Sequence, residues 1–202
     1  MPRLLPLFPL DLVLLPGASL PLHIFEPRYK EMIGECLDEH RPFGIVRAQA
    51  KGIAVAGCTA EIVDVVRRYP DGRLDILSEG RDRFEVTQVN QERAFLQGEV
   101  VYFSDEPDRP PRDRIERMME LHQQLVALSG DTKKSEQPPD AGLSFQLAAS
   151  LPLDLDFKQA LLNLRSEEKR VEAMIQCYEA LIPSLTRTLH AQKRAGGNGH
   201  IH

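Results

Sequence analysis

The residue types best suited to chemistry are three cysteines and six histidines, spread along a chain of 202 residues. Cys36, Cys58 and Cys177 are an odd number and form no Cys-x-x-Cys, which argues against a disulfide framework and against a structural zinc site. Each lies among apolar neighbours, where an unpaired cysteine packs like a small hydrophobic residue. We therefore predict that all three are packing residues and that none holds a metal.

The histidines offer no better base or metal ligand. His23 lies in a strand-like apolar run, and His40 follows a predicted helix, whose dipole favours a cation at that end. His122 falls on an apolar helical stripe, which predicts a hydrogen-bonded core histidine. His200 and His202 form His-x-His at the end of the chain, and two ligands make a poor metal site.

Motifs that mark catalytic sites are missing from the sequence. A phosphate-binding loop needs two glycines and a lysine at fixed spacing, and the Lys133-Lys134 pair follows Gly130 at the wrong distance. Neither G-x-S-x-G nor H-E-x-x-H occurs. Asp154 and Asp156 are close in sequence, but a helix cap explains Asp154 better than a pair of catalytic carboxylates does. We predict no catalytic residue, no metal and no cofactor.

The charge balance bears on the partner. The chain has 25 Lys and Arg against 30 Asp and Glu, a net charge of −5. Because phosphate-backbone binding needs a basic surplus, we do not expect nucleic acid as the partner. One feature favours it, a group of arginines near a predicted turn: Arg67, Arg68, Arg81 and Arg83. Acidic residues surround this group, which predicts a solvated face of mixed charge.

The front half of the chain, residues 1–105, is rich in short β-branched runs. Pro70 and Gly72 predict a hairpin turn between two of them. One helix, Glu26–Glu39, begins with Pro27 and carries a single apolar stripe. The pattern predicts a twisted barrel or sandwich with this helix plugging one end. The expected strands are Leu4–Leu10, Leu20–Ile24, Phe43–Arg47, Cys58–Tyr69, Leu74–Leu77, Phe84–Val89 and Phe95–Phe103.

The back half changes to helical spacing after a linker at residues 106–111, which holds three prolines. Ser166 predicts the N-cap of a long last helix, and Pro183 predicts a kink in that helix near Glu179. The remaining expected helices are Arg112–Leu128, Leu143–Ala149 and Asp154–Leu164, with a polar loop at Ser129–Asp140. We expect a β-rich subdomain at residues 1–105, a helical bundle at 112–194 and a disordered tail at 195–202.

The N-terminal apolar run does not predict a signal peptide. Pro6, Pro9 and Asp11 interrupt it, and no small-residue cleavage site follows. No stretch of about 18 uninterrupted apolar residues occurs, so we expect no membrane-spanning segment. We expect a protein of the cytoplasm that has no membrane partner.

Several short motifs, in order, resemble one known family. The runs LPLFPL at 5–10, VLLPG at 13–17 and LPLHIFEPRY at 20–29 look like the start of a Lon-protease amino-terminal, substrate-binding domain. The runs GCTAEI at 57–62, PDGRL at 70–74 and G-x-x-R-F at 80–84 match its next part. The segments SLP at 150–152 and KQALL at 158–162, with Ser166 and Arg170, resemble its helical end. The resemblance covers nearly the whole chain.

The resemblance implies an α+β fold: a PUA-like pseudo-barrel with one inserted helix, followed by a helical bundle. It also implies a non-catalytic module that binds polypeptide, in a stand-alone form that lacks the ATPase and peptidase of Lon. An RNA-binding module is the alternative, because PUA-like barrels in other families bind RNA. Full-length Lon activity is not carried over, and the oligomeric state stays open.

Two surfaces are expected to bind polypeptide, through apolar contacts and edge-strand pairing. One covers the hairpin and the Glu26–Glu39 helix, and the other is a groove between the barrel and the helical half. The candidate contact residues are Phe25, Arg28 and Tyr29. The competing interpretation is that Phe25 and Tyr29 belong to the core and that Arg28 pairs with a nearby carboxylate.

Overall fold

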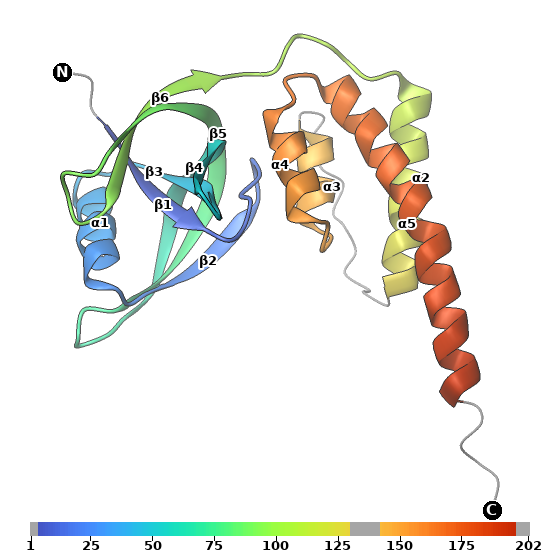
Figure 1. Ribbon diagram of the computed structural model, residues 1–202, viewed down its shortest axis with the longest axis horizontal. Coiled ribbons are helices and arrows are strands. Elements are labelled where there is room, and N and C mark those ends of the chain that lie inside the picture. The colour runs from blue at the N-terminus through green and yellow to red at the C-terminus, as the bar shows by residue number, and fades with distance from the viewer. Residues whose placement is uncertain (1–3, 130–141, 197–202) are drawn as a thin grey trace, which may run out of the picture. The chain divides into compact units, whose positions relative to one another are not determined.

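The computed structural model describes residues 4–129 and 142–196, and it divides into two compact units (Figure 1). The strand unit comprises described residues of 1–105 together with 148–165, and the helical unit comprises described residues of 106–147 and 166–202. The sequence favoured two consecutive segments, whereas the structure groups residues 148–165 with the strands. The elements are β1 Leu5–Leu10, β2 Ser19–Ile24, α1 Pro27–Asp38, β3 Phe43–Gln49, β4 Gly52–Arg68, β5 Leu74–Asn90, β6 Leu96–Phe103, α2 Arg112–Ser129, α3 Leu143–Ala149, α4 Leu155–Asn163 and α5 Glu167–Gly196.

The strand unit is a six-stranded sheet in the order β2-β5-β4-β3-β1-β6, closed by a further pairing of β5 with β6. Among the described strands, β1 and β3 are the one pair that runs parallel. The segment between them contains β2 and α1. Leu5, Leu7, Val46 and Phe84 form a buried cluster inside the closed part. The mixed α+β fold expected from the sequence is confirmed.

Helix α1 lies at one end of the barrel (Figure 1). Pro27 stands in its first turn, where the missing N–H costs no helical hydrogen bond. The buried residues are Tyr29, Met32, Ile33 and Cys36, at the spacing of one helical stripe. The predicted helix and its buried face are therefore confirmed.

The hairpin between β4 and β5 is also confirmed. The N–H of Gly72 donates to the carbonyl oxygen of Tyr69 at 3.0 Å, and Gly72 adopts a positive φ of 81°. Beyond the turn, however, the two short strands expected at 74–77 and 84–89 are one strand of 17 residues, β5. Within this strand Gly80 allows the Leu15 backbone to approach closely, because a Cβ there would lie 2.3 Å from the carbonyl oxygen of Leu15.

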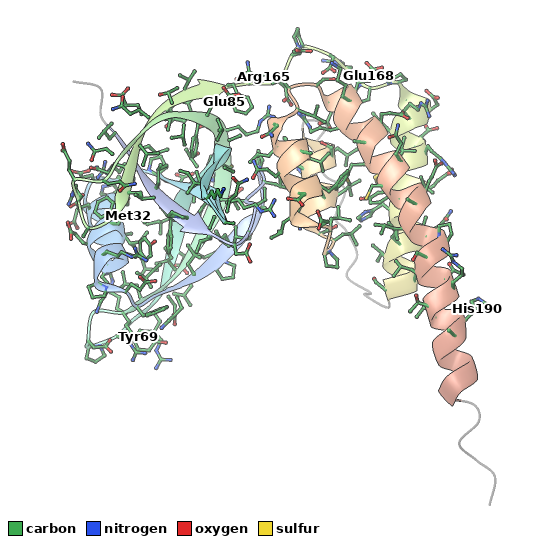
Figure 2. The ribbon with its side chains drawn as sticks, viewed as in Figure 1. Met32, Tyr69, Glu85, Arg165, Glu168 and His190 are labelled. Atoms are coloured by element: carbon green, nitrogen blue, oxygen red, sulfur yellow. The ribbon has the colours of Figure 1, made fainter. Side chains whose placement is uncertain are left out.

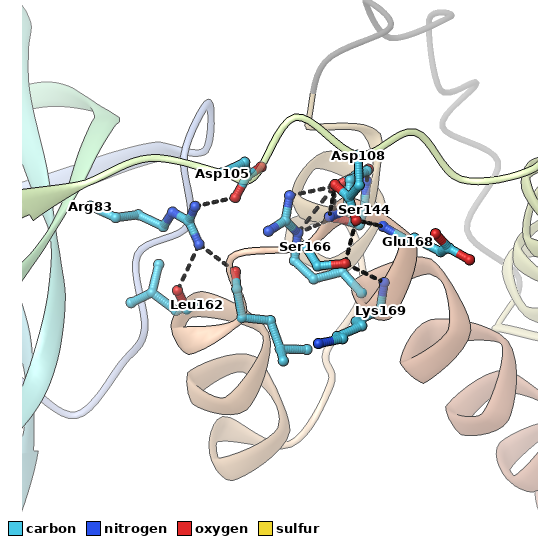
Figure 3. Close-up of polar contacts among 11 residues, drawn as sticks. Arg83, Asp105, Asp108, Ser144, Leu162, Ser166, Glu168 and Lys169 are labelled. Atoms are coloured by element: carbon cyan, nitrogen blue, oxygen red, sulfur yellow. Dashed lines mark hydrogen bonds and ion pairs between the residues drawn. The ribbon is translucent and has the colours of Figure 1, made fainter.

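Helix α4 belongs to the strand unit, and Arg83 on β5 attaches it (Figure 3). The Arg83 guanidinium donates to the carbonyl oxygens of Leu162 at 3.0 Å and Leu164 at 2.6 Å, and it pairs with Asp105. The expectation that Arg83 lies on a solvated face is wrong, because only 5% of it is exposed. Carbonyls at a helix C-terminus lack intrahelical partners, and this buried arginine satisfies them.

The helical unit is organised around the start of α5 (Figure 3). Ser166 accepts the N–H of Lys169 at 3.1 Å, as the predicted N-cap should, and Asp108 accepts the N–H groups of Glu167 and Glu168. The hydrogen bond from the Ser166 hydroxyl lowers the pKa of Asp108 most, and the two backbone N–H groups lower it further. The sequence did not single out Asp108, because its partners lie almost sixty residues away.

A buried polar network lies beside this cap. The Ser144 hydroxyl donates to a carboxylate oxygen of Glu167 at 2.8 Å, and Arg170 bonds that carboxylate at 2.5 Å. Arg170 is 0% exposed, and its guanidinium lies 4.2 Å from the ring centroid of Phe145. The charge of Arg170 is thus paired inside the unit.

Helix α5 continues through Pro183 to Gly196. Pro183 is exposed and does not break the helix, and the kink expected near Glu179 stays a prediction. Earlier in α5, Tyr178 is fully buried against α2 and lies 3.0 Å from Nδ1 of His122. The prediction that His122 is a hydrogen-bonded core residue is confirmed.

Candidate binding surface

Three strand segments leave the closed barrel and form a smaller sheet, which we call the ribbon: β2, residues 61–68 of β4 and residues 74–79 of β5. In this part β5 lies between β2 and β4, and β3 pairs only with β4 residues up to Ala60. The register aligns His23 on β2 with Asp75 on β5, and Asp75 with Arg67 on β4. Since aligned residues of antiparallel strands share a face, these three side chains lie on one face, the ribbon face.

Polar contacts fix the centre of the ribbon face. The Asp75 carboxylate bonds His23 Nδ1 at 2.5 Å with one oxygen and accepts the Tyr69 hydroxyl at 2.8 Å with the other. These hydrogen bonds, and the charge of Arg67, lower the pKa of Asp75 below its usual value. The carboxylate is therefore ionised at neutral pH and holds two rings in place.

Aromatic rings surround this centre. The ring of His23 stacks on Phe25 at 5.9 Å and meets Tyr69 edge-on at 5.8 Å. The guanidinium groups of Arg67 and Arg73 lie 4.6 and 4.7 Å from the centroid of the Tyr69 ring. Figure 2 shows Tyr69 at the far end of the hairpin. The tip of the ribbon therefore presents aromatic and cationic groups to solvent.

Beside the rings lies a shallow groove of about 350 Å³. Its lining residues are Pro21, Leu22, His23, Val66, Asp75 and Ile76. Phe25 is 58% exposed and Val66 is 64% exposed, large values for apolar side chains. An apolar groove with a few fixed polar groups suits a side chain that carries both kinds of surface.

The free edges of the ribbon are poorly suited to pairing with a further strand. In the register of β4 with β5, Val63 falls between Ile62 and Asp64, and Val66 between Val65 and Arg67, without a partner of its own. Each is a β-bulge, which twists an edge away from further pairing. On the opposite edge, Pro21 in β2 removes a backbone donor. Contact through side chains therefore fits this surface better than the edge-strand pairing expected from the sequence.

The three candidate contact residues lie in different environments. Phe25 is exposed at the ribbon tip, whereas Tyr29 is 7% exposed and stacks on Phe8 at 3.9 Å. Burial raises the pKa of Tyr29. Arg28 pairs with Glu26 at 2.8 Å and lies over the Tyr29 ring. Phe25 and Arg28 are thus accessible, and Tyr29 is a core residue.

The residues that complete the surface, Asp75, Tyr69 and Val66, were not predicted. Nothing in the local sequence distinguishes Asp75 from the other acidic residues near the turn. Its role depends on the alignment of β2 with β5, which joins residues 52 positions apart. An alternating pattern predicts a half-buried strand and does not say which strand lies beside it.

A second groove, of about 380 Å³, lies between β4 and α4 within the strand unit. The Gln159 amide donates to the carbonyl oxygen of Ala56 at 3.1 Å on its floor. Val55 is exposed beside it. This groove lacks the aromatic rings of the ribbon face.

Groups able to act as nucleophiles or metal ligands are not gathered anywhere in the described residues. No cluster of three His, Cys, Asp or Glu side chains suited to a metal occurs in the parts that the structure describes, which do not include His200 and His202. Cys36 and Cys58 are buried, and burial raises the pKa of the Cys58 thiol to about 12. Cys177 is partly buried rather than fully packed. Among the described helices, none is long and apolar enough to cross a membrane.

The fold and its surface together define an α+β domain with an exposed apolar and aromatic face on a barrel-like sheet. The chain matches the family model of the ATP-dependent protease La (LON) substrate-binding domain over residues 4–177. It belongs to that family, as the order of its motifs indicated.

Solved structures agree with this assignment. The Lon N-terminal domain protein of Xanthomonas campestris is similar, with a TM-score of 0.70, 28% identity, and coverage of 86% of this chain and 98% of that one. The N-terminal domain of the Mycobacterium avium complex Lon protease has a TM-score of 0.64 at 18% identity, over 88% of this chain and 98% of that one, which shows a common fold.

Curated relatives are longer proteins. Lon protease 1 of Hydrogenovibrio crunogenus is 25% identical over 87% of this chain, and the Lon protease of Parabacteroides distasonis is 29% identical over 54% of it. The chain spans about a quarter of the first relative's length, 23%, and 14% of the second's.

Proposed function

We propose that this chain is a non-catalytic module that binds unfolded or extended polypeptide through the ribbon face. The observation that carries the proposal is the exposed set of Phe25, Val66 and the groove beside His23, held in place by the Asp75 hydrogen bonds. Large apolar groups that are exposed together on a soluble domain mark interaction sites.

The family supports this proposal. Its model is described as a substrate-binding domain, and the curated relatives are named as proteases. A polypeptide is the substrate that a protease must recognise. We infer that binding without turnover is the task of this chain, and that any link to proteolysis runs through a separate catalytic part.

Cysteines outside disulfides fit a cytoplasmic setting for this chain. Cys36, Cys58 and Cys177 form no disulfide in the structure, and thiols persist in the reducing cytoplasm. An unfolded client in that compartment exposes the apolar side chains that the ribbon face would receive.

The expected affinity is modest. Association costs ~4–15 kcal/mol of lost freedom, and a client that is unfolded loses further entropy when it is ordered. The ribbon face offers a small contact area of exposed apolar side chains, so weak binding that exchanges quickly is expected. Such binding suits a module that inspects many different segments.

The test is fluorescence anisotropy with a labelled, permanently unfolded polypeptide. Phe25→Ser and Val66→Ser should each weaken binding about threefold to tenfold, because each removes apolar contact worth ~1 kcal/mol. Val101→Ser is the matched control, since Val101 is also exposed but lies on β6, outside the ribbon. If all three substitutions weaken binding equally, the ribbon face is not the polypeptide-binding surface.

RNA is the second candidate partner, because stacked arginine and tyrosine at the hairpin tip resemble the stacking platforms that bind single strands. The net charge of −5 opposes it. A gel shift with single-stranded RNA at two salt concentrations tests this alternative. If RNA is the partner, its affinity should fall steeply at the higher salt concentration, because phosphate binding weakens with salt.

A further inference from the structure

Arg67 is the one charged residue of the ribbon-face centre that lacks an ion pair. It stands across from Asp75 in the register of β4 and β5. No carboxylate among the described residues lies within ion-pair distance of its guanidinium. Both Asp75 oxygens are already bonded, one to His23 and the other to Tyr69.

Two neighbouring arginines are each paired with a carboxylate. Arg73 bonds the Asp71 carboxylate at 2.7 Å, and Arg28 bonds the Glu26 carboxylate at 2.8 Å. The guanidinium of Arg67 is instead held 4.6 Å from the Tyr69 ring centroid. A guanidinium stacked on a ring keeps its N–H edge free, and that edge matches a carboxylate through two parallel hydrogen bonds.

Val66, the residue before Arg67, lines the groove. The bulge at Val66 and the cross-strand position of Arg67 bring an apolar contact and a free cation together on one face. A ligand that fills the groove with an apolar side chain would place its next few atoms near the guanidinium.

We propose that the ribbon face selects polypeptide segments in which an acidic side chain lies close in sequence to an apolar or aromatic one, and that Arg67 binds the carboxylate. This inference rests on the proposed function and names the class of segment preferred. Tyr69 and His23 are positioning residues, because they occupy Asp75 and so leave Arg67 available.

A single carboxylate suits the site better than a chain of phosphates does. Asp75 lies beside Arg67, and Asp64 and Asp71 lie on either side along the hairpin. A polyanion crossing this surface would meet those carboxylates, whereas one carboxylate on a flexible segment can avoid them. Because the same acidic residues also repel the carboxylate of the peptide, the gain in binding affinity from its ion pair with Arg67 is small.

The experiment uses three labelled, unfolded peptides of one length that differ at one position, two residues after a phenylalanine: Asp, Asn or Lys. The full chain should bind the Asp peptide about threefold to fivefold more tightly than the Lys peptide, the range of a partly exposed ion pair. Arg67→Gln should remove this preference, so that the ratio of the affinities for the Asp and Lys peptides falls to about one.

Arg68→Gln is the matched control. Arg68 is adjacent in sequence, carries the same charge and points to the opposite face of the strand, so the preference should survive. Tyr69→Phe keeps the ring but frees one Asp75 oxygen to take Arg67, so the preference should shrink.

Each outcome is decisive. A preference that survives Arg67→Gln, or that Arg68→Gln removes equally, overturns the assignment to Arg67 while polypeptide binding stands. A single-stranded RNA that displaces the peptides and loses affinity with Arg67→Gln overturns a polypeptide carboxylate as the ligand. If the Asn peptide does not bind either, the proposed function fails as well.

Discussion

Two carboxylates in this protein, Glu167 in the helical unit and Asp75 in the strand unit, have similar partners but different surroundings. Each is bonded by a hydroxyl group and by a nitrogen of a basic side chain. The arginine that bonds Glu167 is fully buried, whereas the groups around Asp75 are partly exposed. The buried network holds a helix junction together, and the exposed one arranges side chains that remain free to meet a ligand.

The difference shows that burial, rather than the kind of hydrogen bond, decides whether a polar network is structural. A buried charge that loses its partner faces a large desolvation cost. An exposed charge is hydrated when its partner is removed, so its loss has a small effect on folding.

The largest expected effect comes from the buried network. Glu167→Ala removes a carboxylate that bonds the buried Arg170 and should lower the free energy of unfolding by ~3–5 kcal/mol. Urea denaturation measures this. Arg112→Ala, which removes an exposed i,i+4 pair with Glu116, is the control and should cost under ~0.5 kcal/mol.

A smaller effect is expected from pH at His122. Burial lowers the pKa of His122 in the folded protein. Below the unfolded pKa of about 6.5, the imidazole is therefore protonated in the unfolded chain while it stays neutral in the folded chain. Stability should therefore fall as pH drops from 7 to 5. His122→Gln should lose this component. Equal slopes for the two proteins would contradict a neutral buried imidazole.

The smallest effect is expected from Asp75→Asn. The pKa of Asp75 is lowered in the folded state, so its contribution is present above the unfolded pKa of about 3.9 and is lost as pH falls through the folded value. Thermal melts at neutral pH should differ little between variant and parent, and any difference should shrink in acid. A loss as large as that of Glu167→Ala would remove the contrast between the two networks.

Local patterns in the sequence predicted most of the elements. The stripe in Glu26–Glu39, the turn at Pro70 and Gly72 and the cap at Ser166 each depend on residues within one or two turns of chain, and the structure has all three. The Asp154 cap is also present, where the side chain accepts the N–H groups of Asp156 and Phe157.

The structural features that the sequence did not predict depend on residues that are distant along the chain. The polar run at residues 78–83 looked like an interruption, yet Ser78 and Arg83 are buried within the continuous β5. Arg83 is stabilised there by carbonyls about eighty residues away. The ribbon face depends in the same way on strand alignment, and of the three candidate contact residues only Phe25 lies exposed at its tip.

The continuous strand β5 carries Asp75 near one end and Arg83 eight residues away from it, inside the barrel. A pull on a client held at the ribbon would therefore travel along one covalent strand into a close-packed interior, which deforms little. From Arg83 it would pass to the last turn of α4 through the carbonyls of Leu162 and Leu164. The hairpin is thus mechanically connected to helix α4 through β5 and Arg83.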